Sequence, residues 1–159
     1  MSKSKLTSQI RIWIIFFVIV LVLSGVTAFP IQTEINYLAN SCKWLPTFLY
    51  NWILQIQQGI NDSYAKYPFL AYGTDWLAFA HIVIGMAFYG VYKNPVRNIW
   101  IIDWAMLCCL AVFPLTFIAG YIRHIPFFHQ IIDCSFGIIG LIPLKIVKNK
   151  ILKLEAMQP

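Results

Sequence analysis

The chain has 159 residues, of which 60% are hydrophobic and only 11% are charged. A soluble domain carries roughly a quarter charged residues, and a domain of this length has too much surface to hide so many apolar side chains from water. The composition therefore excludes an ordinary soluble domain and indicates that many apolar side chains face lipid.

The first apolar run covers residues 12–29 and holds no charged residue. Crossing ~30 Å of hydrocarbon takes roughly 17 to 25 helical residues, so this run is long enough for a membrane span. Lys3, Lys5 and Arg11 precede it and residues 26–28 resemble a cleavage site, so a secretory signal is the alternative interpretation. The run exceeds the usual apolar core of a signal peptide, which favours an uncleaved anchor.

Residues 30–73 are too long for a turn and too apolar for a disordered linker, so we expect a small helical cap. Between residues 48 and 60, apolar side chains recur at helical spacing with amides at other positions. This pattern predicts an amphipathic helix of about 13 residues along the outer interface. A shorter helix around residues 33–41 is expected before it. The cap is interpreted either as a lid or docking surface, or as an interfacial anchor that closes the bundle.

Three further spans are predicted at about residues 75–92, 95–122 and 126–147. Thr74 is the expected N-cap of the second span, Asn94 and Pro95 are the expected start of the third, and Pro126 is that of the fourth. Short links between these spans force neighbouring helices to be antiparallel. The sequence therefore predicts a single-domain, all-α integral membrane protein. Its expected architecture is a four-helix antiparallel bundle with an amphipathic extracytoplasmic cap between the first two spans and a basic cytoplasmic tail at 148–159.

The basic residues are distributed unevenly over the two sides of this arrangement. The 12 Lys and Arg outnumber the 6 Asp and Glu, which gives a net charge of +6. One side holds Lys3, Lys5, Arg11, Lys93, Arg97, Lys145, Lys148, Lys150 and Lys153, and the other holds Lys43, Lys66 and Arg123. Cytoplasmic loops carry the excess of Lys and Arg, so both termini are expected in the cytoplasm of a bacterial inner membrane. Because the basic residues lie beside span ends, nucleic acid is not an expected partner.

Ionisable residues within a span are costly and mark a candidate site by default. In the second span, His81 shares a helical face with Ala78 and Gly85, small residues that permit the close approach of a neighbour. In the fourth, His129 and Asp133 are four residues apart and share a face. We therefore expect a polar ligand-binding pocket in the outer half of the bundle. Its members are Tyr72, Asp75, His81, Tyr121, Arg123, His124, His129 and Asp133.

Three interpretations of this pocket stay open. In the first, it is an interfacial charge network in which Arg123 neutralises Asp75 or Asp133. In the second, the same polar groups bind an organic ligand or a lipid headgroup. In the third, the pocket holds a metal ion or a haem, because imidazole and carboxylate suit zinc, iron and copper. The metal ligands would be His81, His124 and His129.

Two side-chain pairs are predicted outside the pocket. Asp103 lies near the cytoplasmic end of the third span and is expected to pair with Lys145, with Arg97 as the alternative. Cys42 and Cys134 both fall toward the outer, oxidising side, so a disulfide between them would tie the cap to the fourth span.

The sequence favours a non-enzymatic function and holds no phosphate loop or nucleophile elbow. We expect an accessory membrane component that binds membrane lipid, a lipid-like ligand, another membrane or periplasmic protein, or a second copy of itself. Arg123, His81 and His129 would hold an anionic or polar group, while Asp75 and Asp133 orient them. One alternative is a membrane redox, metal or haem protein that uses the three histidines. Another is a lipid-modifying enzyme with His129 and Asp133 as an acid/base pair.

Overall fold

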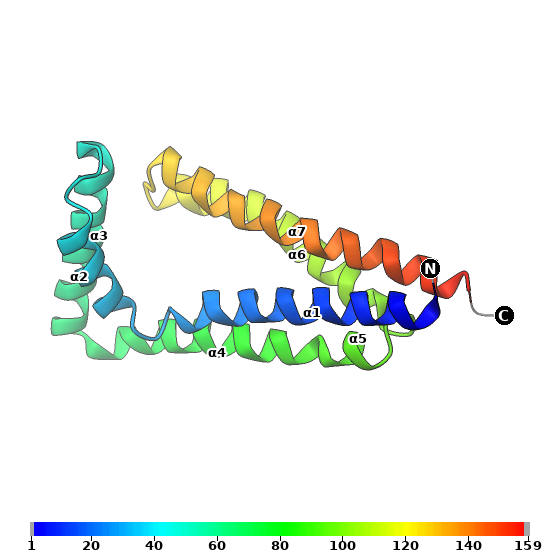
Figure 1. Ribbon diagram of the computed structural model, residues 1–159. Helices are drawn as coiled ribbons and strands as arrows, with labels where there is room; N and C mark the ends of the chain where they lie inside the picture. The colour runs from blue at the N-terminus through cyan, green and yellow to red at the C-terminus, as the bar shows by residue number, and fades with distance from the viewer. Residues whose placement is uncertain (1, 158–159) are drawn as a thin grey trace. The chain divides into compact units, whose positions relative to one another are not determined.

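The computed structural model describes residues 2–157, and this part of the chain is helical with no strand (Figure 1). The helices are α1 (Lys3–Val26), α2 (Ile31–Ser41), α3 (Thr47–Lys66), the 3-10 turn η1 (Pro68–Leu70), α4 (Ala71–Ala87), α5 (Tyr89–Lys93), α6 (Ile99–Ile122) and α7 (Phe127–Glu155).

Four helical stretches are long and apolar enough to cross a membrane. They cover Lys3–Val26, Pro68–Lys93, Ile99–Ile122 and Phe127–Glu155 and are between 24 and 29 residues long. Large apolar side chains stay exposed along them: Leu23 is 60% exposed, Leu107 64% and Phe136 63%. A surface of this kind is stable in hydrocarbon and costly in water. The prediction of an all-helical chain with four such helices is confirmed.

The second span begins earlier than its sequence suggests and is interrupted near its end. α4 starts at Ala71, so Thr74 is not its N-cap, and the Thr74 hydroxyl donates instead to the Ala71 carbonyl at 2.7 Å. The turn η1 leads directly into α4 and makes a separate cap unnecessary. A break at Phe88 separates α4 from α5. α5 ends at Lys93 because a residue before proline is pushed out of the helical region, and Asn94 has φ −140° and ψ 85°.

Other helix bounds also differ from the predicted ones. α6 begins at Ile99 and not at Pro95, because residues 94–98 form a turn in which the Asn94 side chain accepts a bond from the Arg97 N–H at 3.3 Å. α3 has 20 residues, longer than the amphipathic run alone. α7 continues past residue 147 to Glu155, so most of the basic tail is helical.

The chain forms two compact units. The terminal unit consists of Met1–Ile19 and Met86–Pro159, and the central unit consists of Val20–Gly85. The terminal unit contains the first part of α1 and all of α5, α6 and α7. The central unit contains the end of α1, all of α2 and α3, and most of α4. We describe each unit by itself.

In the terminal unit, α6 and α7 lie side by side and run in opposite directions (Figure 1). Glycines of α7 and α6 make this approach possible. A Cβ on Gly137 would lie 2.6 Å from the Cys109 carbonyl oxygen, and one on Gly120 would lie 2.6 Å from the side chain of Gln130. The side chains buried most deeply in this unit are Leu6, Ile10, Ile14, Phe88, Val91, Ile102, Leu144, Val147 and Ile151. α1, α5, α6 and α7 therefore share one apolar core.

In the central unit, α2 and α3 pack against each other through amide side chains, a contact that the sequence pattern does not reveal. Asn36 Oδ1 accepts from Asn61 Nδ2 at 2.9 Å, and Asn61 Oδ1 accepts from Asn36 Nδ2 at 3.4 Å. Gln57 donates to Asn36 at 2.9 Å and Gln32 donates to Asn61 at 3.0 Å. Partly buried amides need partners, so this four-residue amide cluster fixes the register of the α2–α3 hairpin.

We predict that Gly137→Ala destabilises the α6–α7 pair. The new Cβ would meet a backbone carbonyl that cannot rotate away, and overpacking of this kind costs about 1 to 3 kcal/mol. Thermal unfolding of the detergent-purified protein, followed by circular dichroism, should show a lower midpoint.

Gly59→Ala is the matched control, because Gly59 lies inside α3 with nothing within 4 Å of its Cβ position. There the substitution should stabilise by about 0.5 to 1 kcal/mol. If the two variants unfold at the same temperature, the close α6–α7 approach is refuted.

Candidate functional site

The eight residues of the predicted polar pocket fall into both units. Tyr72, Asp75 and His81 belong to α4 in the central unit. Tyr121, Arg123, His124, His129 and Asp133 belong to the α6–α7 end of the terminal unit. The pocket as a whole therefore stays a prediction, and each half is described within its own unit.

In the central unit, His81 lies where α4 meets α1. A Cβ on Gly25 would lie 2.2 Å from the Cβ of His81, so the two helices touch at this pair. Ala78 and Gly85, on the same face of α4, are buried. His81 Nδ1 lies 2.8 Å from the Leu77 carbonyl oxygen, so a hydrogen bond here requires a ring that carries a proton on Nδ1.

Asp75 and Tyr72 lie near the start of α4. Asp75 is half-buried, and Tyr72 is exposed with its ring stacked edge-on against Trp76 at 5.9 Å between centroids. The neighbouring Thr74 hydroxyl lies 3.2 Å from the hydroxyl of Tyr64 on α3. This contact joins α3 to the first turn of α4.

In the terminal unit, His124 occupies a tight turn between α6 and α7. Its φ is 56°, in the left-handed region. The His124 N–H donates to the Tyr121 carbonyl at 3.3 Å, and the Ile125 N–H donates to the Gly120 carbonyl at 2.9 Å. These two bonds are those of a Schellman cap, in which glycine usually takes the left-handed position. His124 is exposed, so its position is explained by the turn itself.

His129 and Asp133 are brought together on the first turns of α7. His129 Nε2 lies 3.8 Å from Asp133 Oδ1, and both side chains are about a third exposed or more, at 34% and 40%. At that distance the pair is an ion pair only when the imidazole is protonated, and it is longer than a hydrogen bond. Arg123 and Tyr121 are exposed at the same end of α6.

Gln130 is a residue of this end that the sequence analysis missed. It is 8% exposed, packs against Gly120 and donates from Nε2 to the Ile125 carbonyl at 2.8 Å. The link between α6 and α7 is therefore held by a buried amide. The signal for it was a single amide in the apolar run that starts α7.

Within residues 2–157, no group of three or more His, Cys, Asp or Glu side chains is close enough to hold a metal ion. Of the predicted ligands, His124 and His129 lie in one unit and His81 in the other. The metal or haem site therefore remains a prediction. The four cysteines are free thiols in the structure, with Cys134 buried, and Cys42 and Cys134 lie in different units. The disulfide also remains a prediction.

The ion pair of Asp103 has a different partner from the predicted one. Lys148 Nζ lies 2.6 Å from Asp103 Oδ1, so the prediction of Lys145 was wrong. Leu144, Val147 and Ile151 form the buried stripe of α7. Lys148 flanks that stripe on the side of Asp103, whereas Lys145 is exposed and lies further round the helix. From this position the side chain of Lys148 can reach Asp103 on α6.

Basic side chains connect α1, α5, α6 and α7 in the terminal unit. Lys148 binds α6 through Asp103, and Lys150 Nζ donates to Gln9 Oε1 of α1 at 2.7 Å. Arg11 of α1 donates from Nε to the Tyr92 carbonyl at the end of α5, at 3.2 Å. These contacts connect α7 to α6, α7 to α1, and α1 to α5. All nine basic residues assigned to the cytoplasmic side belong to this unit.

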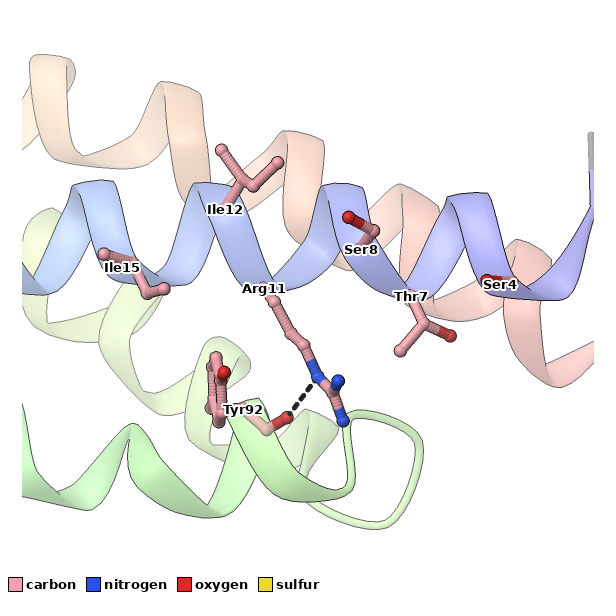
Figure 2. Close-up of a pocket in the computed structure, with 7 residues that line it drawn as sticks. All are labelled: Ser4, Thr7, Ser8, Arg11, Ile12, Ile15 and Tyr92. Carbon is pink, nitrogen blue, oxygen red and sulfur yellow. Dashed lines mark hydrogen bonds between the residues drawn. The ribbon is translucent and has the colours of Figure 1, made fainter.

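An open groove of about 520 Å³ lies beside Arg11 on the first turns of α1 (Figure 2). Hydroxyl side chains of α1 and Tyr92 of α5 line it together with Arg11. The sequence analysis counted Arg11 as an orientation signal alone and missed the groove. The signal was a run of hydroxyl residues three or four apart on the helical face of Arg11, at positions 4, 7 and 8.

No protein-family model, curated protein or solved structure matches this chain.

We predict that His124→Gly stabilises the protein, whereas His124→Val destabilises it. The left-handed conformation raises the free energy of a residue with a Cβ by roughly 1 to 2 kcal/mol, and glycine avoids this cost. A β-branched side chain fits the conformation of residue 124 poorly. Thermal unfolding in detergent should rank the variants Gly above His above Val. A midpoint that falls for His124→Gly would show that the imidazole makes stabilising contacts, and the turn would not explain the residue.

Proposed function

We propose that the protein is a small, non-enzymatic component of a membrane that binds a partner protein, or a lipid-like ligand, through the α2–α3 hairpin. The four long helices would form an antiparallel bundle, and the hairpin would be its extracytoplasmic cap. Both termini would lie in the cytoplasm of a bacterial inner membrane. Nine of the 12 Lys and Arg flank the predicted cytoplasmic ends of the spans, and this excess supports the orientation.

The observation that carries the proposal is a hairpin with a fixed interior and exposed aromatic side chains. The amide cluster fixes α2 against α3, and Tyr50 adds a hydrogen bond from its hydroxyl to the Ala39 carbonyl at 3.1 Å. Meanwhile Trp44 is 79% exposed and Tyr37 71%. Rigid aromatic side chains on a preorganised surface lose little entropy on binding, which is why they are enriched in recognition surfaces.

The direction of the hairpin also supports a role outside the spans. α2, with 11 residues, is too short to be a candidate span, and α3, with 20, is not apolar enough. Within the central unit, Figure 1 shows α2 and α3 running across the direction of α4. Amphipathic helices with this relation to a span lie along the membrane interface, where Trp and Tyr are favoured.

A second candidate function is a lipid-modifying enzyme. The specific observation in its favour is the approach of His129 to Asp133, which would let the imidazole exchange a proton with a substrate hydroxyl or phosphate. His129→Ala and Asp133→Ala separate the two candidates, because a binding component keeps its capture of a partner in both variants.

The test is photo-crosslinking in intact cells, with a benzophenone amino acid in place of Trp44. We expect one defined adduct, a protein or a lipid by mass spectrometry, and none from the same probe at Gln58, an exposed polar position of α3. Asn36→Ala removes the centre of the amide cluster and should abolish the adduct, while His129→Ala should retain it.

Three outcomes would contradict the proposal: no adduct from position 44, equal adducts from positions 44 and 58, or an adduct that survives Asn36→Ala. Capture that is lost in His129→Ala and kept in Asn36→Ala would instead support the second candidate.

A further inference from the structure

The groove beside Arg11 has a lining suited to an anion. It lies wholly within the terminal unit, between the first turns of α1 and the end of α5. Its lining carries one guanidinium, three aliphatic hydroxyls and no carboxylate. A site with a fixed positive charge, several hydroxyl donors and no negative charge favours phosphate-like ligands.

The guanidinium of Arg11 is held in a fixed plane. Its Nε donates to the Tyr92 carbonyl at 3.2 Å, and its Cζ lies 5.1 Å from the centre of the Tyr92 ring. Figure 2 shows the group reaching from α1 to the end of α5, with its two terminal nitrogens beyond the bond to Tyr92. Within residues 2–157 no hydrogen bond is made by these two nitrogens, so up to four N–H donors stay available.

The hydroxyls extend the same face of α1 toward its start. Ser4, Thr7 and Ser8 precede Arg11 at spacings of three and four residues, which places all four on one side of the helix. The Thr7 hydroxyl donates its proton to the Lys3 carbonyl oxygen at 3.0 Å, so only its lone pairs remain free. Among the described residues, the hydroxyls of Ser4 and Ser8 have no hydrogen-bond partner. Both can donate to a bound oxyanion.

The other end of the groove is apolar. Ile12 is 62% exposed and Ile15 46% exposed, and both line the groove deeper along α1. The uncharged apolar run of the first span starts at Ile12, directly after Arg11. The groove therefore crosses the level at which this helix changes from polar to apolar, which is the level of the headgroups for a membrane span.

We infer that this groove binds the phosphate of an anionic phospholipid. Arg11 holds the phosphate oxygens with its terminal N–H groups, Ser4 and Ser8 donate to the same headgroup, and an acyl chain lies along Ile12 and Ile15. A free phosphate ion would use the polar end alone and would gain nothing from the two isoleucines. The site is independent of the α2–α3 hairpin and goes beyond the function proposed for it.

The test is lipid binding measured by native mass spectrometry. The full chain is released from nanodiscs of phosphatidylcholine with increasing fractions of phosphatidylglycerol. Wild-type protein should retain phosphatidylglycerol, and Arg11→Gln should bind it about tenfold or more weakly, because a hydrogen bond to a charged group is lost. Arg97→Gln removes an exposed charge of the same unit outside the groove and should bind like wild type.

A second variant keeps the proposal testable if Arg11→Gln fails to fold. Ser8→Leu fills the groove from an exposed position, leaves Arg11 in place, and should weaken lipid binding by a similar factor. Millimolar inorganic phosphate should not displace the lipid. Equal binding by Arg11→Gln, Ser8→Leu and Arg97→Gln would overturn the inference. Displacement by inorganic phosphate would overturn the lipid as the source of the bound group.

Discussion

The constraint on which this structure depends is that hydrocarbon offers no hydrogen bonds to a polypeptide backbone. This chain, whose residues are 60% hydrophobic, satisfies its backbone amides by pairing them inside helices. The four long helices meet this requirement, and their exposed leucines, isoleucines and phenylalanines need no protein partner because lipid covers them. The few polar side chains must then find partners of their own.

Polar side chains connect the helices within each unit, and the two units use different kinds of polar contact. The terminal unit joins its helix ends through Asp103 with Lys148, Gln9 with Lys150, and Arg11 with Tyr92. The central unit uses neutral amides instead, with Asn36 and Asn61 at the centre. Amides suit this partly buried contact because they form directed bonds without the desolvation cost of a charge. Asp103 and Lys148 are both partly exposed, so their ion pair contributes modestly to stability.

The features set by composition could be predicted from the sequence, and those set by packing could not. Four apolar runs and the turn at residues 123–125 follow from hydropathy and proline alone, and the structure has the corresponding helices. The start of α4 at Ala71 depends on the preceding turn η1, which no cap signal marks. The partner of Asp103 depends on the rotation of α7, which places Lys148 and not Lys145 beside α6. The amide cluster and the Arg11 groove depend on which helices become neighbours, and a single sequence does not specify that.

The central claim is that the long helices cross a membrane with their basic ends on one side. Cysteine accessibility tests this most directly on α6, which is flanked by Asn94 in the turn before it and by its C-cap Arg123, both exposed. In a variant whose four native cysteines are replaced by serine, Asn94→Cys and Arg123→Cys are each treated in intact cells with a membrane-impermeant maleimide. We predict that position 123 is labelled at once and that position 94 is labelled only after the membrane is permeabilised. Labelling of both positions in intact cells, or protection of both, would contradict the account.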